Sequence, residues 1–253
     1  MIQRLGVVGW PVDHSRSPAM FQAAFQHLGL EHDHRYQRVP IPPELAAETI
    51  AALGGAGFAG VNVTMPHKAT ALGIATVATD RAKAIGAANT LTFEPDGTIH
   101  ADNTDAPGLI DALGEPPRTA LVLGAGGSAR AVVWALKEAG TDVSVLARTP
   151  ARAEGLGARI VDAPTPADCL VNCTPIGMDD PDALPADPEP YATVVDLVYQ
   201  SGRTALLRRA EAAGARTVDG IEVLVRQGAL SFERWTGMDA PLDAMRRGAR
   251  GVH

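Results

Sequence analysis

The sequence predicts an α/β protein with two α/β domains that flank a cleft. The first observation is that predicted strands and helices alternate along the chain, since short apolar runs are followed by segments whose apolar residues recur at helical spacing. The second is a glycine-rich turn at residues 124–129, which joins a strand to a helix in the middle of the chain. The third is size, since 253 residues, 46% hydrophobic and 20% charged, are enough for one large globular domain or two medium ones.

Turn residues and apolar spacing locate most of the individual elements. Strands are expected between turn residues, at 5–9, 36–41, 60–64, 91–93, 98–101, 119–123, 142–146, 168–174, 193–199 and 216–218. The strands at 91–93 and 98–101 are expected to pair as a hairpin. Helices are expected at 18–28, 43–53, 204–213 and 242–250, with further helices opening at Lys68, after Asp105, after the glycine turn and at Ile221.

The glycine turn lies between a buried strand and a helix. Thr119–Leu123 is a short β-branched run, and apolar residues at helical spacing continue from Ala131 until Gly140 ends the helix. Glycines allow a tight bend and close approach of a pyrophosphate, and the helix N-terminus offers N–H groups to an anion. A plain tight turn is the alternative, but the flanking strand and helix favour dinucleotide binding. The residues expected to bind the cofactor here are Gly124, Ala125, Gly126, Gly127, Ser128 and Ala129.

The end of the next strand, 142–146, indicates which dinucleotide binds. An acidic residue about 20 positions after the glycines would bind a ribose hydroxyl and select NAD. This chain has no acid there, and Arg148, Thr149 and Arg152 follow the strand instead. Two guanidinium groups and a hydroxyl suit a 2′-phosphate, so the sequence favours NADP. A solvated basic loop is the alternative, and it competes more strongly for Arg152 than for Arg148.

The composition argues against several classes of partner. A net charge of −7 and the lack of a basic stripe argue against nucleic acid. The sequence shows neither a signal peptide nor an apolar run long enough to cross a bilayer, so we expect no membrane partner. Cys169 and Cys173 are expected on the same face of one strand, without the companions of a metal site. We therefore expect no metal and a reducing cytoplasm.

Two serines lie at the start of the first helix, just after the strand 5–9. Ser17 precedes Pro18, which is typical of an N-cap followed by a first-turn proline. Ser15 is not needed for a cap and therefore carries more of the functional argument. Hydroxyls beside the N–H groups of a helix N-terminus suit a carboxylate, so we expect a carboxylate site here. For Ser17, capping alone is a sufficient alternative.

A lysine follows the strand 60–64. Lys68 opens a helix, where its charge opposes the helix dipole, so its placement indicates a function rather than a structural benefit. Asn62 and Thr64 share one face of the preceding strand. We expect their side chains to point toward whatever Lys68 contacts.

The polar run Asp102-Asn103-Thr104-Asp105 precedes another helix. Capping is an alternative for Asp102 and for Thr104, but the run holds more polar groups than one cap needs. Because the dinucleotide unit starts soon afterwards, at Pro116, we expect Asp105 at the junction of two domains. Such a junction is where a ligand cleft commonly forms.

Eight ordered segments, spread over nearly the whole chain, resemble the shikimate dehydrogenase family. They are G-W-P-V-D-H-S-R-S-P at 9–18, N-V-T-M-P-H-K at 62–68, G-A-A-N-T at 86–90, D-N-T-D at 102–105, G-A-G-G-S-A-R-A at 124–131, N-C-T-P-I-G-M at 172–178, D-L-V-Y at 196–199 and D-G-I-E-V-L-V-R-Q-G-A at 219–229. The resemblance implies a substrate domain over 1–104 and 220–253 and a Rossmann-type NADP-binding domain over 105–219. It implies reversible reduction of 3-dehydroshikimate to shikimate with NADPH, in aromatic amino-acid biosynthesis.

The resemblance also implies roles for individual residues. Lys68 and Asp105 correspond to the catalytic pair, and Ser15 and Ser17 to the groups that hold the substrate carboxylate. The residues that bind ring hydroxyls or complete the pocket are Asn62, Thr64, Asn89, Tyr199 and Gln227. On the cofactor side the resemblance adds Thr174, Met178 and Gly220. For Gln227 an ordinary surface position is the alternative.

The implied pair agrees with the chemistry of ketone reduction. Hydride transfer to a ketone leaves an alkoxide, to which an ammonium can supply a proton while a carboxylate orients the groups. Whether Lys68 gives the proton directly or through water stays open. Two departures from the family pattern are Ala106-Pro107, where glycine is expected after D-N-T-D, and Ala147, where asparagine is common. Pro107 suits a first helical turn but stiffens the expected hinge, and Ala147 bears on cofactor affinity.

Two other functions remain as alternatives. A dehydrogenase of quinate or another cyclohexane carboxylate would keep the class, although serine at both 15 and 17 favours shikimate. A non-catalytic relative that binds shikimate-type acids would change the class, and the presence of both Lys68 and Asp105 argues against it. We expect a cytoplasmic enzyme that acts as a monomer or homodimer.

Overall fold

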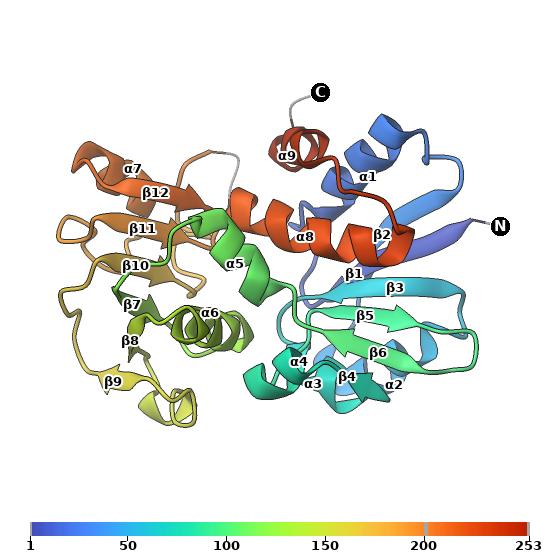
Figure 1. Ribbon diagram of the computed structural model, residues 1–253, viewed down its shortest axis with the longest axis horizontal. Helices are drawn as coiled ribbons and strands as arrows, with labels where there is room; N and C mark the ends of the chain where they lie inside the picture. The colour runs from blue at the N-terminus through green and yellow to red at the C-terminus, as the bar shows by residue number, and fades with distance from the viewer. Residues whose placement is uncertain (1, 200–201, 252–253) are drawn as a thin grey trace. The chain divides into compact units, whose positions relative to one another are not determined.

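A computed structural model describes residues 2–199 and 202–251, and its contacts divide the chain into two compact units. Unit 1 comprises Met1–Thr104 and Val225–His253, and unit 2 comprises Asp105–Leu224 (Figure 1). Each unit contains a six-stranded sheet with helices packed on it, which confirms the α/β class. Within the described residues, no helix combines the length and apolar character needed to span a membrane.

The sheet of unit 1 is mixed and has the strand order β2-β1-β3-β5-β6-β4. Its strands are β1 (Gln3–Gly9), β2 (His34–Pro40), β3 (Phe58–Val63), β4 (Val77–Ala78), β5 (Thr90–Phe93) and β6 (Ile99–Asp102). Strand β1 pairs parallel with β2 and β3, while β5 runs antiparallel to both β3 and β6. The expected hairpin is therefore confirmed as β5–β6. The two-residue strand β4 was not expected, because so short a segment has no readable alternation.

The helices of unit 1 bury apolar side chains against this sheet. They are α1 (Ser17–Leu28), α2 (Ala46–Ala52, after a 3₁₀ turn at Pro43–Leu45), α3 (Lys68–Gly73), α4 (Asp80–Ile85), most of α8 (Gly220–Thr236) and α9 (Leu242–Arg250). Helices α1 and α8 meet β2 in an aromatic cluster, in which the Phe21 and Tyr36 rings stack at 4.1 Å. Helix α8 approaches β3 so closely that Trp235 leaves no room for a side chain at Gly60. Because α8 is fixed on the sheet in this way, its polar residues have defined positions.

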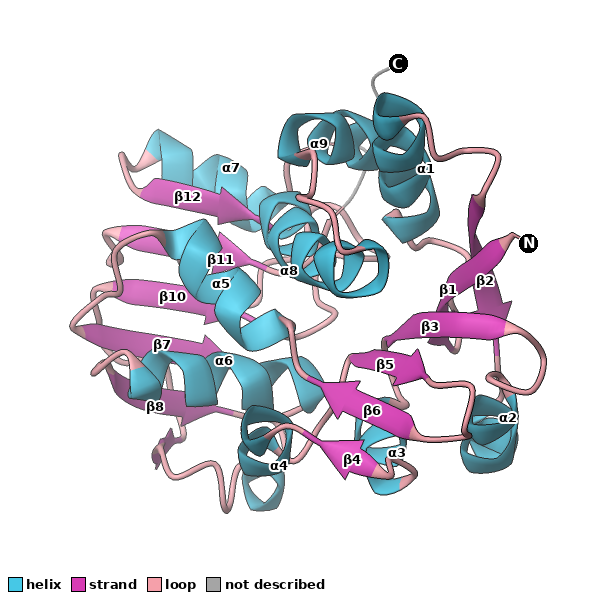
Figure 2. Cartoon of the chain, turned by 45° about the vertical axis from the view of Figure 1, so that its right-hand side comes forward, coloured by secondary structure: helices cyan, strands magenta, loops and turns pink. Residues whose placement is uncertain are grey.

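The sheet of unit 2 is entirely parallel, with the order β12-β11-β10-β7-β8-β9. Its strands are β7 (Thr119–Leu123), β8 (Asp142–Leu146), β9 (Arg159–Val161), β10 (Cys169–Asn172), β11 (Thr193–Asp196) and β12 (Arg216–Asp219). Its helices are α5 (Asp105–Leu113), α6 (Gly127–Glu138) and α7 (Ala205–Ala212), with a 3₁₀ turn at Pro150–Arg152. Figure 2 shows α5 and α6 side by side on this sheet.

The strand order of unit 2 reverses beside β7. From β7 the chain moves outward through β8 and β9, then returns to the other side of β7 with β10 and continues to β12. In open parallel sheets, ligands bind at the carboxyl ends of the strands at such a switch point. The glycine turn 124–126 follows β7 directly, so the fold puts it at this switch point.

One expectation about an element boundary needs correction. Strand β10 ends at Asn172, so the half-buried Cys173 lies beyond the strand and does not share a face of it with Cys169. Burial raises the pKa of the Cys169 thiol to about 12, which fits a structural residue. The first turn of α8, Gly220–Leu224, belongs to unit 2. At Gly220 a Cβ atom would lie 2.6 Å from the Leu197 carbonyl oxygen, so this turn packs closely on unit 2.

Candidate functional site

Unit 1 brings together the segments that follow β1 and β3. The Thr64 N–H donates to the Val8 carbonyl over 2.8 Å, and the Trp10 N–H donates to the Met65 carbonyl over 3.0 Å. Ser15, Ser17 and Lys68 follow these strand ends and are 4%, 4% and 7% exposed. A lysine this buried is uncommon in proteins. Its position at the first residue of α3, after β3, confirms the expected placement of Lys68.

The serine that supports the start of α1 is Ser15, whereas the sequence suggested Ser17 as the cap. Helix α1 begins at Ser17, and the residue before it, Arg16, already has helical dihedral angles. The Ser17 N–H donates to the Ser15 Oγ over 3.3 Å, whereas the side chain of the N-cap residue Arg16 makes no capping hydrogen bond. Ser17 is therefore inside the first turn, and Ser15 is the serine that supports the helix start. Arg38 Nη2 also holds the Ser15 carbonyl, at 2.8 Å.

Asn62 is the first centre of a buried polar network. Its Nδ2 donates to the Ser231 Oγ at 2.8 Å and to the Thr90 Oγ1 at 3.2 Å. The Tyr36 hydroxyl donates to the Asn62 Oδ1 over 2.8 Å. Because both ends of the amide have partners from other elements, its orientation is fixed.

Asn89 is the second centre of the same network. Its Nδ2 donates to the Gln227 Oε1 at 3.1 Å and to the Thr104 Oγ1 at 3.0 Å, and its Oδ1 accepts the Thr104 N–H at 2.7 Å. Gln227 is 6% exposed, so the alternative of an ordinary surface glutamine is wrong. The Ala88 N–H also donates to the Lys68 carbonyl over 2.9 Å, which ties the Asn89 segment to α3. The structure therefore brings Asn62, Asn89 and Gln227 together, as the resemblance implied for one pocket.

Thr64 has a different environment from Asn62. It lies one residue beyond β3 and is partly exposed, and its methyl group leaves no space for a side chain at Gly9. Its side chain therefore packs on the end of β1.

Sequence reasoning missed three residues of the network. Ser231 lies one helical turn after Gln227, so i, i+4 spacing on α8 could have revealed it. Thr90 follows Asn89 directly and bonds the Ser231 hydroxyl at 3.0 Å. Tyr36 lies on β2, far from Asn62 in the sequence, and no local signal marks it.

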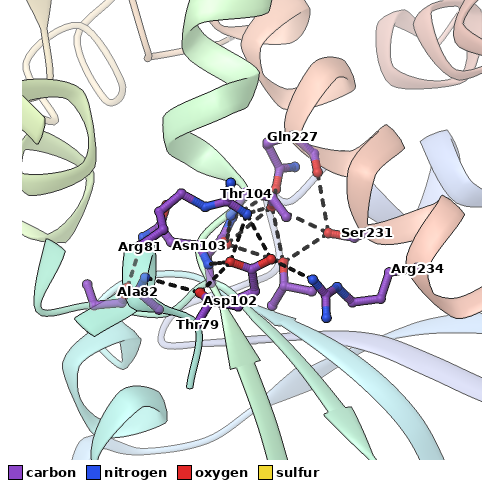
Figure 3. Close-up of polar contacts among 12 residues, drawn as sticks. Thr79, Arg81, Ala82, Asp102, Asn103, Thr104, Gln227, Ser231 and Arg234 are labelled. Atoms are coloured by element: carbon purple, nitrogen blue, oxygen red, sulfur yellow. Dashed lines mark hydrogen bonds and ion pairs between the residues drawn. The ribbon is translucent and has the colours of Figure 1, made fainter. Parts of the chain in front are cut away.

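Asp102 was expected as a possible helix cap, and this alternative is wrong. Its carboxylate accepts hydrogen bonds from Arg81 at 2.8 Å, from Arg234 at 2.6 Å and from the Thr79 hydroxyl at 2.8 Å (Figure 3). Burial acts to raise the pKa of Asp102, but the Thr79 hydroxyl and the Arg81 charge outweigh it and bring the pKa below its ordinary value. Thr104 likewise belongs to the Asn89 network, since its N–H and hydroxyl both contact that side chain.

The glycine turn of unit 2 meets the requirements for a dinucleotide. Gly124 has φ = 104°, a left-handed conformation that favours glycine, and its Cβ would lie 3.4 Å from the Cys173 backbone. At Gly126 no described atom lies within 4 Å of where a Cβ would be, so a ligand can approach the backbone. Helix α6 begins at the next residue, and Ala129 is fully buried where this helix meets the sheet. A pyrophosphate fits a turn of this kind.

The residues after β8 border an open hollow. Arg148, Thr149 and Arg152 are all exposed, and Arg148 lines the hollow together with Ala147, Pro150 and Ile160. Exposed guanidinium groups beside a groove can hold a 2′-phosphate. Asp162 lines the same hollow and was not considered from the sequence, because it follows the short, unexpected strand β9.

The loop after β10 is held by an internal hydrogen-bond chain. The Thr174 hydroxyl donates to the Asn172 Oδ1 at 2.7 Å, and the Asn172 Nδ2 donates to the Asp196 Oδ1 at 2.9 Å. Burial raises the pKa of Asp196, whose partners are neutral hydrogen-bond donors. Met178 closes the same loop, with its N–H donating to the Pro175 carbonyl over 3.0 Å.

Three further residues of the expected site belong to unit 2. Asp105 is the first residue of α5, and the helix continues through Ala106 and Pro107, so the local fold accommodates this departure from the family pattern. Tyr199 is half-buried after β11, just before the two residues outside the described ranges. Gly220 starts α8, and the nearby Leu197 and Val198 carbonyls account for the glycine structurally. Across residues 2–199 and 202–251, no group of three or more His, Cys, Asp or Glu side chains could hold a metal ion.

The fold and the site together define a class of protein. A parallel sheet with a glycine turn at its switch point is typical of dinucleotide-binding domains. The other α/β unit, unit 1, holds a buried set of amides and hydroxyls, the kind of polar groups that orient a small molecule in a binding site. This combination is typical of two-domain nicotinamide-dependent dehydrogenases.

Comparison with known proteins identifies the family. Residues 7–91 match the family described as Shikimate dehydrogenase substrate binding domain, and residues 220–249 match Shikimate 5'-dehydrogenase C-terminal domain. A Methanocella arvoryzae protein named Shikimate dehydrogenase (NADP(+)) is 43% identical, over 99% of both chains. A protein of the same name from Cereibacter sphaeroides is 44% identical, over 96% of this chain and 95% of its own. The chain belongs to the shikimate dehydrogenase family.

Solved structures agree with this assignment. Shikimate 5-dehydrogenase from Thermus thermophilus, crystallised in complex with NADP(H) and shikimate, is 40% identical and superposes with a TM-score of 0.89 over 100% of both chains. The shikimate dehydrogenase of Aquifex aeolicus is 32% identical, with a TM-score of 0.90 over 98% of both chains.

Proposed function

We propose that this chain is an NADP-dependent shikimate dehydrogenase that interconverts 3-dehydroshikimate and shikimate. The observation that carries the proposal is full-length similarity to proteins named Shikimate dehydrogenase (NADP(+)), including 43% identity over 99% of both chains. The Thermus thermophilus relative with NADP(H) and shikimate has the same fold over 100% of this chain. The buried amides and hydroxyls of unit 1 and the glycine turn of unit 2 supply the groups that such a reaction needs.

Unit 1 is proposed to bind the substrate. Ser15 and Ser17, at the start of α1, hold the carboxylate, because hydroxyl and helix N–H groups both donate to an anion. The residues that bind the ring hydroxyls are Asn62, Thr64, Asn89 and Gln227, with Tyr199 supplied by unit 2. The network around Asn62 and Asn89 fixes their amide groups before substrate binds, which reduces the ordering cost of binding.

Unit 2 is proposed to bind NADP. Residues 124–129 would hold the pyrophosphate of NADP, and Arg148, Thr149 and Arg152 would hold its 2′-phosphate. Thr174, Met178 and Gly220 would complete the cofactor site. The bound nicotinamide supplies or accepts the hydride. The chain of hydrogen bonds from Asp196 through Asn172 holds the loop that contains Thr174 in place, so that this loop can contact the cofactor.

Lys68 and Asp105 are proposed to handle the proton. Lys68 is buried at a strand end in unit 1, and its ammonium supplies the proton that the alkoxide takes up during reduction. Asp105 starts the first helix of unit 2, and its carboxylate accepts a hydrogen bond from the substrate hydroxyl. In the oxidative direction the neutral Lys68 amine accepts the hydroxyl proton and becomes the ammonium again.

A crossed steady-state assay tests the function. Purified protein should reduce NADP when given shikimate, with a higher kcat/KM than for any other combination of shikimate or quinate with NADP or NAD. The matched control is Lys68→Ala, which should lose the shikimate-dependent rate and still bind NADP. A higher kcat/KM for quinate than for shikimate would show that quinate is the preferred substrate. No turnover with wild-type protein would support a non-catalytic relative that binds shikimate-type acids.

The cellular setting is also proposed. We propose a cytoplasmic location, supported by Cys169 and Cys173, which form no disulfide within the described residues. We propose a monomer or homodimer, and sedimentation equilibrium of the purified protein would decide between them.

A further inference from the structure

We propose that Asp102 and Arg234 form a positioning pair for the substrate site, in which their ion pair holds α8 so that Gln227 and Ser231 meet the two asparagines of unit 1. This inference rests on the proposed function of unit 1. Neither residue is among those that the family resemblance implies for the site.

Asp102 is a fully engaged buried carboxylate. Its side chain is 3% exposed, and Arg234 Nη2 lies 2.6 Å from its Oδ2. Arg81 Nη2 lies 2.8 Å from both carboxylate oxygens, and the Asn103 N–H donates to Oδ1 over 2.7 Å. Figure 3 shows the carboxylate between the two guanidinium groups. Removing one partner from a buried ion pair leaves a charge that water cannot fully solvate.

Three contacts come from one face of α8. Gln227, Ser231 and Arg234 are separated by four and three positions, so they lie on the same side of the helix. Gln227 accepts from Asn89, Ser231 accepts from Asn62, and Arg234 donates to Asp102. A rotation or shift of α8 would therefore change all three contacts together.

Asp102 also holds the partner of Gln227 through its backbone. Its carbonyl accepts the Asn89 N–H at 3.0 Å, and Thr104, two residues later, donates its N–H to the Asn89 Oδ1 at 2.7 Å. One residue thus fixes Asn89 through the main chain and α8 through the side chain. The 3.1 Å hydrogen bond between Asn89 and Gln227 joins the two parts that Asp102 holds.

Arg81 provides a matched control on the same carboxylate. The side chains of Arg81 and Arg234 are similarly exposed, at 32% and 38%, and both pair with Asp102. Arg81 comes from α4, which carries none of the proposed site residues. Without Arg81, Thr79 still caps α4 at the Ala82 N–H and still donates to Asp102. Each substitution thus removes one arginine from Asp102, but the loss at Arg234 loosens α8.

The experiment compares Arg234→Gln, Arg81→Gln and Arg234→Lys in the full chain. Arg234→Gln should raise the KM for shikimate about tenfold while kcat stays within about twofold, because it moves binding groups and leaves Lys68 in place. Arg81→Gln should change that KM by less than about twofold. Arg234→Lys keeps a cation within reach of Asp102 and should recover most of the loss. Equal KM changes for Arg234→Gln and Arg81→Gln would overturn the inference, as would an unchanged KM in both.

Amide hydrogen exchange gives a readout that needs no substrate. Arg234→Gln should speed exchange in residues 225–236 and 89–90 more than Arg81→Gln does, since it frees α8 from Asp102. Indistinguishable exchange in the two variants would overturn the positioning pair by itself. If wild-type protein does not oxidise shikimate, the proposed function fails, and the exchange comparison still decides whether Arg234 holds α8.

Discussion

The two units carry their candidate sites in contrasting ways. In unit 1 the site consists of buried side chains from distant segments, such as Asn62, Asn89 and Gln227, held by one hydrogen-bond network. In unit 2 it consists of a backbone turn with positive φ at Gly124 and of exposed arginines after β8. Substitutions in unit 1 should therefore affect stability and function together, whereas those at the exposed positions of unit 2 should affect function alone.

Two buried aspartates show the same contrast in their charge. Asp102 in unit 1 pairs with two arginines, and its pKa lies below the ordinary value. Asp196 in unit 2 has neutral donors from Asn172, Thr204 and the Val198 backbone, and burial raises its pKa. The partners of a buried carboxylate therefore decide the direction of its pKa shift. Cations favour the ionised form, whereas neutral donors do not fully offset the loss of water.

The largest expected effect is at Lys68. Lys68→Ala should lower kcat by about 10²–10⁴-fold, the usual contribution of a general acid or base, with a smaller change in the KM for shikimate. Stopped-flow and steady-state kinetics would measure it, with NADP affinity as the control. Nearly full turnover at saturating shikimate would mean that Lys68 only binds a hydroxyl.

The next effect compares the two aspartates directly. Asp102→Asn should lower the free energy of unfolding by about 3 kcal/mol, since an amide NH₂ would face arginine donors. Asp196→Asn should cost less than about 1 kcal/mol, because the Thr204 hydroxyl can turn to accept from the new amide. Urea denaturation at neutral pH measures both. Equal losses of unfolding free energy would contradict the distinction between the carboxylate that pairs with arginines and the carboxylate that has neutral hydrogen-bond donors.

Arg148 tests whether a substitution in the unit 2 site changes cofactor binding without changing the stability of the protein. Arg148→Ala should raise the KM for NADP by about 10–100-fold, the equivalent of a charge-assisted hydrogen bond of about 1.5–3 kcal/mol. The KM for NAD and the melting temperature should stay nearly constant, because the side chain is exposed. Equal changes in both KM values would show that Arg148 does not contact the 2′-phosphate.

The paired serines sharpen the comparison within unit 1. Ser15→Ala should weaken shikimate binding and also lower the free energy of unfolding by about 1 kcal/mol, because Ser15 supports the first turn of α1. Ser17→Ala should weaken binding with a smaller loss of stability. Thermal denaturation in parallel with shikimate KM would show it, and the reverse order would restore Ser17 as the cap.

The smallest effect is the pH dependence of stability. The lowered pKa of Asp102 means that its contribution is fully present above the ordinary value of 3.8 and is lost as pH falls through the lower folded value. The raised pKa of Asp196 gives the opposite sign, so its contribution is present below 3.8 and is lost as pH rises through the raised value. Asp102→Asn should therefore change the pH slope of unfolding below the ordinary value of 3.8, and Asp196→Asn should change it with the opposite sign above that value.

The sequence predicted strands and helices best where the pattern was long or well bounded. Strands β7 and β8 and helix α9 have the expected bounds, because turn residues flank their apolar residues. The sequence did not predict β4, β9 or α4, whose two to six residues are too few to show a period.

The site was predictable by residue type but not by partner. Lys68 was singled out because it follows a strand, Asn62 because it lies on one face of that strand, and Asn89 through the family resemblance. Ser17 was expected as the N-cap of α1, but the helix begins one residue earlier than expected, so Ser17 lies in its first turn and the Ser15 Oγ accepts the Ser17 N–H. Asp102 was expected as a cap because Arg81 and Arg234 are far away in the sequence, and only the folded unit brings them together.

The most direct test of the account is an equilibrium titration of each ligand alone. Isothermal calorimetry would measure the Kd of shikimate and of NADP for wild-type protein, Ser17→Ala and Arg148→Ala. We predict a crossed pattern of binding. Ser17→Ala should weaken the binding of shikimate and leave that of NADP unchanged, while Arg148→Ala should weaken the binding of NADP and leave that of shikimate unchanged. Weakening of both ligands by either variant, or no binding of shikimate to wild-type protein, would contradict it.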